Sequence, residues 1–187
     1  MIEQTFLLVK PDGVQRALIG KIISRLEDTG LKVVAMKMVL PDKKLAGIHY
    51  AEDKAWMESV GAKTLAAFKE KGVSSNETAL QIGNKVRRYL IDYITSGPVV
   101  AAVIEGNEAI FITRKILGAT EPRKADPSSV RGAYSISSYE LADEQKRAVR
   151  NIAHASEDKK TAEREISIWF KPGELVKYKR IDEGAIY

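Results

Sequence analysis

The sequence predicts a single domain that mixes α-helices with β-strands, and three observations carry this prediction. Three apolar segments have the composition of strands, at residues 5–9, 31–40 and 98–104. Segments with apolar residues at helical spacing lie between and after them. The 187 residues suffice for one substantial core, and the chain shows no internal repeat and no linker composition.

The first strand, at residues 5–9, is followed by Lys10, Pro11 and the pair Asp12-Gly13. We expect Pro11 to end the strand and Asp12-Gly13 to turn the chain. Lys10 then stands at a strand end, where it either meets a ligand or lies along the sheet edge. The apolar face of the next helix comprises Ile19, Ile22, Ile23 and Leu26, with Gly30 closing the helix.

Residues 31–40 carry apolar side chains on both faces of the second predicted strand. This pattern fits either a central strand of a sheet or a strand with one face in a subunit contact. Pro41-Asp42 then starts a helix that carries His49 and Tyr50. We expect His49 to lie on the helix surface or at the edge of the core.

Residues 54–95 are predicted to form an arm of two helices. The first helix ends at Lys71-Gly72, and Ser-Ser-Asn-Glu at 74–77 resembles a capping box for the second. The breakers at 95–98 end the second helix. The first helix presents Trp56, Val60 and Phe68, and the second presents Val86, Tyr89, Leu90, Tyr93 and Ile94.

The third strand, at 98–104, is expected to turn at Glu105-Gly-Asn107. The next segment, 107–118, is ambiguous. Residues 110–113 favour a strand by propensity, whereas the segment also shows a helical face. The residues of that possible helical face are Ala109, Ile112 and Ile116.

Residues 119–135 are interpreted as an ordered loop, because they show no clear period. A helix is expected at 139–149, a short turn at 172–174 and a tail at 178–187. The basic residues that the loop would present are Arg123, Lys124 and Arg131.

His154 is the most promising candidate for chemistry, since the small residues Ala153, Ala155 and Ser156 leave its imidazole approachable. Glu165, about three turns into the helix that follows, can fix the ring's tautomer so that the other nitrogen attacks. A structural role for the histidine is an equally weighted alternative from this stretch alone. The helix face here comprises Ala162, Ile166, Trp169 and Phe170.

The composition excludes several classes of protein. The chain has no cysteine and two histidines, which rules out disulfides, thiolate metal sites, a cysteine nucleophile and a histidine-rich metal site. Its start lacks a basic signal-peptide region, and no apolar run reaches the ~20 residues of a membrane helix. We therefore expect a cytoplasmic protein with no membrane partner.

The net charge of +5 suits an anionic partner, either a nucleic acid or a polyphosphate nucleotide. The basic residues are dispersed, however, so a merely solvated surface explains the charge equally well. Binding of a specific nucleic acid would need a basic stripe with interleaved aromatics, which the sequence lacks. No Gly-rich Walker loop is present either, so side chains must hold any phosphate.

Seven segments, in order, resemble the nucleoside diphosphate kinase family: Lys10 to Arg16, His49-Tyr50, Ser96 to Val100, Arg114 to Thr120, Val130 to Gly132, Asn151 to Ser156 and Ala162 to Pro172. The resemblance spans 1–187 as one domain, apart from insertions near 55–90 and 136–149. It implies an α+β, ferredoxin-like sandwich in which helices pack over a four-stranded antiparallel sheet. An extended helical hairpin is expected at the first insertion. The fourth strand, near 151–153, has little support from the residues themselves.

The resemblance also implies an activity. A γ-phosphate would pass from a nucleoside triphosphate, such as ATP or GTP, to a nucleoside diphosphate by a ping-pong mechanism through phospho-His154. The residues matched to catalysis are His154, Glu165, Tyr50 and Ser156, and those matched to nucleotide or phosphate binding are Lys10, Arg114, Thr120, Arg131 and Asn151. Mg²⁺ would arrive with the nucleotide phosphates rather than on protein ligands. Assembly as a homo-oligomer is implied, as a hexamer or a tetramer.

Three positions depart from the family pattern: Ala155 replaces a glycine, Ala133 an aspartate and Glu121 an asparagine. We expect them to alter loop or subunit contacts rather than chemistry. The base-stacking residue is unassigned among Trp56, Leu65 and Phe68. The alternative function is a catalytically silent relative that serves as a nucleotide-binding or scaffold protein. It would have signalled itself by loss of Lys10, Arg114, Arg131 or His154, all of which are present.

Overall fold

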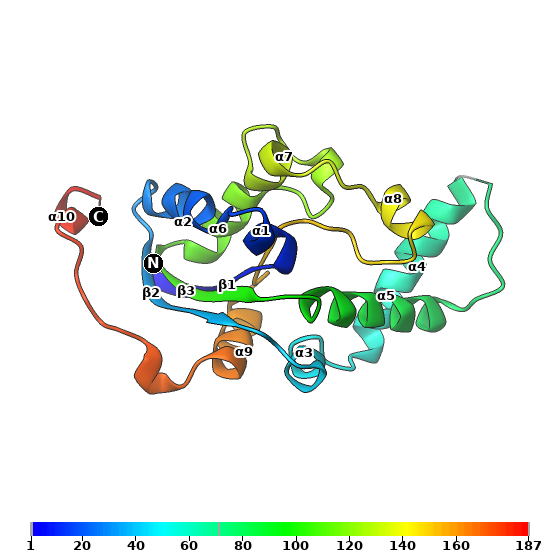
Figure 1. Cartoon of the computed structure of the whole chain (residues 1–187), viewed down its shortest axis with the longest axis horizontal. Helices are drawn as coiled ribbons and strands as arrows, with labels where there is room; N and C mark the ends of the chain where they lie inside the picture. The colour runs from blue at the N-terminus through cyan, green and yellow to red at the C-terminus, as the bar shows by residue number, and fades with distance from the viewer. Residues whose placement is uncertain (1, 71, 187) are drawn as a thin grey trace.

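The structure is a computed structural model that describes residues 2–70 and 72–186 (Figure 1). Its centre is a four-stranded antiparallel sheet with the order β2-β3-β1-β4. The strands are β1 (Ile2–Val9), β2 (Lys32–Val39), β3 (Val99–Asn107) and β4 (Ala153–Ala155). This order, with helices packed over the sheet, is the ferredoxin-like α+β arrangement, and the expected fold class is confirmed.

One face of the sheet is covered by α2 (Ile19–Glu27) and α6 (Ala109–Leu117), which lie together above it in Figure 1. The other face is covered by α3 (Lys43–His49) and α9 (Lys159–Trp169). Successive strand residues face opposite sides, so β1 serves both cores. Leu7 and Val9 lie in the first, Phe6 and Leu8 in the second. This sandwich fixes β4, and therefore His154, from both sides.

The predicted arm is present as α4 (Lys54–Glu70) and α5 (Ala79–Ile94), and it projects from one end of the sheet (Figure 1). Its helices cross in backbone contact at two glycines. A Cβ on Gly61 would lie 1.8 Å from the Ala79 carbonyl oxygen, and one on Gly83 would lie 2.0 Å from that of Met57. The extended helical hairpin is thereby confirmed.

The capping box of α5 was predicted at the wrong place. Thr78 is the N-cap, and its hydroxyl and the Gln81 side chain each satisfy the other's backbone amide. Ser75 instead accepts from the Glu77 amide and closes a local turn before the helix. The predicted end of the first helix at Lys71 lies outside the described residues.

β2 is an edge strand, so the expectation of a central position is wrong. Val34 and Ala35 are buried in the core, whereas Met36, Met38 and Leu40 are 53%, 60% and 72% exposed. Burial within this chain therefore does not explain why the exposed face of β2 is apolar. The alternative, a subunit contact, stays a prediction.

Two predicted turns are regular structure. Pro11 begins α1 (Pro11–Gln15), because its fixed φ and missing N–H suit the first helical position. Residues 105–107 continue β3 and pair with Gln4, Glu3 and Ile2 of β1. The ambiguous segment 107–118 is the helix α6, since burial of one helical face against the sheet outweighs the strand propensity of its isoleucines.

The segment predicted as a loop, 119–135, holds η1 (Pro122–Lys124) and α7 (Val130–Tyr134). The helix predicted at 139–149 is shorter, α8 (Tyr139–Glu144), and Lys146 beyond it has a positive φ of 49°. The turn at 172–174 is η2 (Pro172–Glu174), and the tail contains α10 (Glu183–Ile186).

Candidate active site

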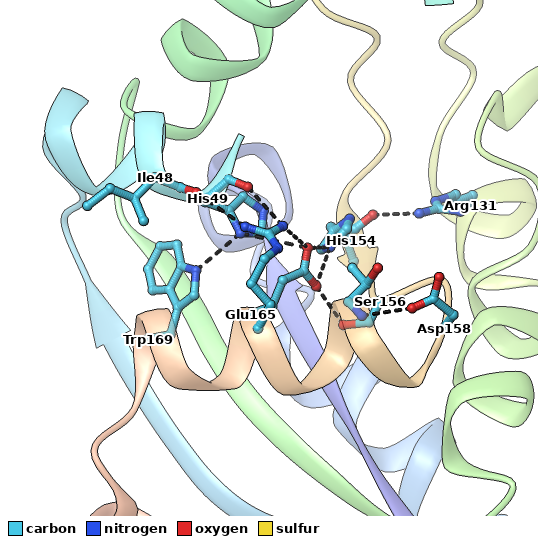
Figure 2. Close-up of polar contacts among 11 residues, drawn as sticks. Ile48, His49, Arg131, His154, Ser156, Asp158, Glu165 and Trp169 are labelled. Carbon is cyan, nitrogen blue, oxygen red and sulfur yellow. Dashed lines mark hydrogen bonds and ion pairs between the residues drawn. The ribbon is translucent and has the colours of Figure 1, made fainter. Parts of the chain in front are cut away.

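His154 is the central residue of the short strand β4, opposite Leu8 of β1. Its neighbours Ala153 and Ala155 point into the core beneath α2 and α6. Strand alternation therefore turns His154 to the other face, toward α9, as Figure 2 shows. Its side chain keeps 25% of its surface exposed. The predicted accessible imidazole on a rigid support is what the structure contains.

Glu165 holds one nitrogen of this ring. The His154 Nε2 atom lies 2.9 Å from Oε1 and 3.0 Å from Oε2 of Glu165, and the Ser156 hydroxyl donates to Oε2 at 2.5 Å. Burial alone would raise the pKa of Glu165, but its contacts with His154, and then His49 and Ser156, lower it to about 2. An ionised carboxylate keeps the proton on Nε2, so Nδ1 carries the lone pair that can attack.

Glu165 reaches the ring from early in α9. Asp158 caps the helix by accepting from the Thr161 amide at 2.7 Å, and the helix starts at Lys159. Glu165 is therefore in the second turn, not the third as the sequence suggested. The small residues around His154 let this turn approach the strand.

His49 was placed wrongly by the sequence analysis. Its side chain is 2% exposed, and its ring meets that of His154 edge to face at 5.1 Å between centroids. The Trp169 indole donates to His49 Nδ1 at 3.3 Å (Figure 2). Burial, followed by repulsion from His154, lowers the pKa of His49 to about 3, so the ring is neutral. The ring centroid of Tyr50 lies 4.6 Å from that of His49.

The end of α3 is drawn into the site by arginine. Arg164 of α9 donates to the carbonyls of Ile48 and His49, and Arg87 of α5 donates to that of Tyr50. These are carbonyls that the end of a helix leaves unpaired. The helical pattern could not show this docking. The only available signal was the His49-Tyr50 pair itself, which lies among the segments that resemble the family.

Lys10 and Asn151 form the second part of the site. The buried Lys10 ammonium donates to Asn151 Oδ1 at 2.8 Å, and the side-chain Nδ2 of Asn151 donates to the Thr120 carbonyl at 3.0 Å. Burial and repulsion by Arg131 lower the pKa of Lys10 to about 7. The predicted pair is therefore assembled, beside the loop that carries Thr120.

Arg131 points inward rather than being presented by a loop. Its fork donates to the carbonyls of Gly118 at 2.6 Å, Ala153 at 2.7 Å and Asn151 at 3.3 Å. Burial and repulsion by Arg114 lower its pKa to about 10, which leaves it charged at neutral pH. Arg131 thus bonds the backbone on both sides of Ile152. Arg123 and Lys124, the other predicted loop cations, form surface ion pairs with Glu140 and Glu121.

Arg114 lies exposed in the last turn of α6, and Thr120 is exposed in the loop after it. Besides burial, repulsion by Arg131 lowers the pKa of Lys10, and repulsion by Arg114 lowers the pKa of Arg131, so Arg131 lies near both other cations. Such a cluster favours an anion with several charged oxygens.

The residue before β4 is held in an unusual conformation. Ile152 has a φ of 70°, and the Ala153 amide donates to the Asn151 carbonyl at 2.7 Å across it. This is a γ-turn of the rare, strained kind. A β-branched residue there costs about 1–3 kcal/mol, which the surrounding contacts must offset. Strain of this size beside a candidate nucleophile is typical of a functional site.

A sequence profile described as nucleoside diphosphate kinase matches residues 3–60 and 79–175. A curated nucleoside diphosphate kinase of Pyrobaculum aerophilum is 42% identical over 180 residues, covering 94% of this chain and 98% of that protein. The chain belongs to the nucleoside diphosphate kinase family. It is a phosphotransferase of that family, as the sequence resemblance implied.

Solved members of the nucleoside diphosphate kinase family have the same fold. The crystal structure of the Pyrobaculum aerophilum kinase covers 95% of this chain and all of its own, with a TM-score of 0.91 and 41% identity. A Borrelia burgdorferi nucleoside diphosphate kinase, solved as a transition-state mimic with vanadate and ADP, gives 0.81 and 38%, covering 98% of this chain and 96% of that one. A Halobacterium salinarum kinase in complex with CDP gives 0.72 and 34%, covering 100% and 99%.

The departures from the nucleoside diphosphate kinase pattern are accommodated locally. Ala155 sits in a β-strand, so its Cβ meets no backbone conflict. Glu121 accepts from the Tyr139 amide at 3.1 Å and thereby ties the loop to α8. Ala133 lines a surface cavity of about 460 Å³ between α1, α7 and α8.

The base-stacking residue stays unassigned. Leu65 and Phe68 line an open cavity of about 400 Å³ at the tip of the arm, together with Val73. Trp56, nearer the base of α4, is 36% exposed. The profile of the family leaves residues 61–78 unmatched. The insertions near 55–90 and 136–149 stay predictions. Among the residues described here, no helix is long and apolar enough to cross a membrane.

Proposed function

We propose that His154 carries the transferred phosphoryl group as a phosphohistidine, in two half-reactions. In the first, the Nδ1 lone pair attacks the γ-phosphorus of a nucleoside triphosphate, the bond to the bridging oxygen breaks and the diphosphate leaves. In the second, a terminal oxygen of another diphosphate attacks the phosphohistidine and the P–N bond breaks. The observation that supports this most is the contact of Nε2 with both oxygens of Glu165, which would leave Nδ1 free to attack.

The cations would hold the phosphates. Arg114 and Arg131 offer planar forks, and Lys10 offers a point charge. Thr120 would add a hydroxyl donor, and Asn151 with Lys10 would bind the sugar hydroxyl. These roles fit an anion, because its charge would relieve the repulsion between the cations of the cluster. Ser156 supports the Glu165 carboxylate, and Tyr50 stands next to His49 beside the nucleophile.

Mg²⁺ is proposed to come with the nucleotide. The residues that could hold a metal ion here are His49, His154 and Glu165, within the described part of the chain. Two imidazoles and one carboxylate do not suit Mg²⁺, which prefers six oxygens, several from water and phosphate. When bound with the nucleotide, the ion would neutralise part of the phosphate charge.

The protein is proposed to act in the cytoplasm as a homo-oligomer, a hexamer or a tetramer. The exposed Met36 and Met38 of the edge strand β2, with Leu40 just after it, form an apolar face that another copy could cover. Nucleotide discrimination is expected to be weak, because stacking is tolerant of ring identity. A preference for one base above ~100-fold, or about 2.7 kcal/mol, would contradict it.

The test is to incubate the protein with γ-labelled ATP in the absence of an acceptor. We expect label that acid removes and base preserves, since phosphohistidine is a phosphoramidate. His154→Ala should take up no label and lose transfer, while His49→Gln should still be labelled. Acid-labile label on His154→Ala would overturn the proposal.

A further inference from the structure

We infer that Asp12 and Tyr93 form a positioning pair that holds the Asn151–Ile152 turn, and through it the nucleophile strand, in the geometry for phosphoryl transfer. The inference rests on the proposed role of His154. Neither residue is among those that we expect to touch nucleotide or phosphate.

The pair binds two consecutive backbone amides. The Tyr93 hydroxyl donates to Asp12 Oδ1 at 2.5 Å and accepts from the Asn151 amide at 3.2 Å. Asp12 Oδ2 accepts from the Ile152 amide at 3.2 Å. Both oxygens of the carboxylate and both functions of the hydroxyl are thereby used. Burial raises the pKa of Tyr93, so the phenol keeps the proton that it donates.

The turn needs support because it is strained. Ile152 has a positive φ of 70° and lies two residues before His154. Its carbonyl side is held by the Lys10 amide, which donates to the Ile152 oxygen at 2.8 Å, and by Arg131, which donates to the Asn151 oxygen at 3.3 Å. Asp12 and Tyr93 hold the amide side. Removing them frees both of these amides, while the contacts to the carbonyls stay.

The pair also reaches the substrate-binding residues. The Lys10 ammonium lies 5.0 Å above the Tyr93 ring and bonds the Asn151 side chain. Tyr93 belongs to the last turn of α5, and Asp12 to α1 directly after β1. The end of α5, the start of α1 and the two residues before β4 therefore meet at one hydroxyl and one carboxylate.

Hydrogen-bond chemistry makes the pair testable. Tyr93→Phe leaves the Asn151 amide without its acceptor and Asp12 without its donor. Asp12→Asn puts an NH2 group in place of one carboxylate oxygen, so either the Tyr93 hydroxyl or the Ile152 amide loses its acceptor. Tyr89→Phe is the matched control, because Tyr89 lies one turn earlier on the same helix and is half-buried.

The measurement is the single-turnover rate at which ATP phosphorylates His154, with kcat and KM alongside. Tyr93→Phe and Asp12→Asn should each slow phosphorylation and kcat at least tenfold, with smaller changes in KM. The double variant should lose much less than the product of the two. Tyr89→Phe should stay within twofold of the wild type. Amide exchange of residues 150–153 should accelerate in Tyr93→Phe and not in Tyr89→Phe.

The outcomes separate this inference from the function on which it rests. A wild-type protein that forms no phosphohistidine at position 154 would end both. A wild type that is phosphorylated normally, with Tyr93→Phe equally fast, would overturn the positioning role alone. If circular dichroism shows that Tyr93→Phe does not fold, the milder variant Asp12→Asn provides the test. A wild-type phosphorylation rate in Asp12→Asn would overturn the positioning role as well. Multiplicative losses in the double variant would show that the two residues do not act as a pair.

Discussion

The two sides of the candidate site differ in how completely the protein itself holds them. On the nucleophile side, Glu165 is 3% exposed and both its oxygens are engaged by His154 and Ser156. On the phosphate side, Arg114 and Thr120 are exposed at a helix end and a loop. The attacking group is therefore preorganised, whereas part of the phosphate grip awaits the nucleotide.

The same contrast divides the cations. Lys10 and Arg131 are 4% and 8% exposed, and both bond the protein as well as facing the cluster. Burial, and then repulsion between the cations, lowers the pKa values of both, so their charged forms are disfavoured in the empty site. A triphosphate relieves it on binding, so the residues that destabilise the empty site contribute to affinity. Variants on the two sides should consequently fail in different ways.

The largest effect is expected from Glu165→Gln. A Gln offers one acceptor where His154 and Ser156 use two, and its amide can donate to Nε2 and move the imidazole proton to Nδ1. That tautomer lacks the attacking lone pair, so kcat should fall ~100-fold or more. Steady-state transfer and phosphohistidine formation measure it. Glu163→Gln, two residues earlier and exposed, is the control.

A loss within fivefold for Glu165→Gln would break the comparison. It would mean that the preorganised contacts of His154 contribute no more to the rate than the exposed residues of the phosphate side.

The next effect is the pH dependence set by Lys10. Its pKa in the free protein is about 7, so the cation is present below that pH and disappears above it. We expect kcat/KM for ATP to fall as pH rises through about 7, up to tenfold per unit. Bound phosphate favours the charged form, so kcat should fall only at higher pH. Lys10→Arg, which stays charged, should remove this limb.

A profile of kcat/KM that is flat from pH 6 to 9 in the wild type would contradict the assignment. So would a limb that persists unchanged in Lys10→Arg.

Sequence patterns predicted most of this fold for a physical reason. Strands β1 and β3 are buried on both faces, so their apolar runs are unambiguous. α6 was ambiguous because its isoleucines favour a strand, and packing against the sheet decided for a helix. β2 was predicted to be central because apolar residues on both faces look the same in sequence, whether they are buried within the chain or exposed at a sheet edge.

The site was predicted less evenly. His154, Glu165 and Lys10 could be located because their chemistry and motif context coincide in short segments. The burial of His49 depends on the docking of α3 against α9, a tertiary contact that no local pattern encodes. The network of Tyr93 is likewise invisible in sequence, since its partners lie 58 and 81 positions away.

A smaller effect is expected on the exposed side, from Arg114→Ala. The loss of one fork should raise KM for ATP about tenfold and lower kcat less, because the nucleophile is untouched. Stability should change by no more than ~0.5 kcal/mol, as for other exposed positions. Thermal unfolding and steady-state kinetics test both parts, with the adjacent exposed Lys115→Ala as control. A fall in kcat as large as that of Glu165→Gln would erase the distinction between the two sides.

The smallest effect concerns the arm, which is more remote than either side. If α4 and α5 close over the nucleotide base, amide exchange in residues 55–93 should slow when a nucleoside diphosphate is added. Gly61→Ala should weaken this response, because its Cβ would lie 1.8 Å from the Ala79 carbonyl oxygen and must push the helices apart. KM should then rise about threefold, which corresponds to ~0.65 kcal/mol, while phosphorylation at saturating ATP stays unchanged. Gly20→Ala is the control, since a Cβ there meets nothing within 4 Å. If the amide exchange rates of residues 55–93 do not change when the diphosphate is added, the arm does not close over the base.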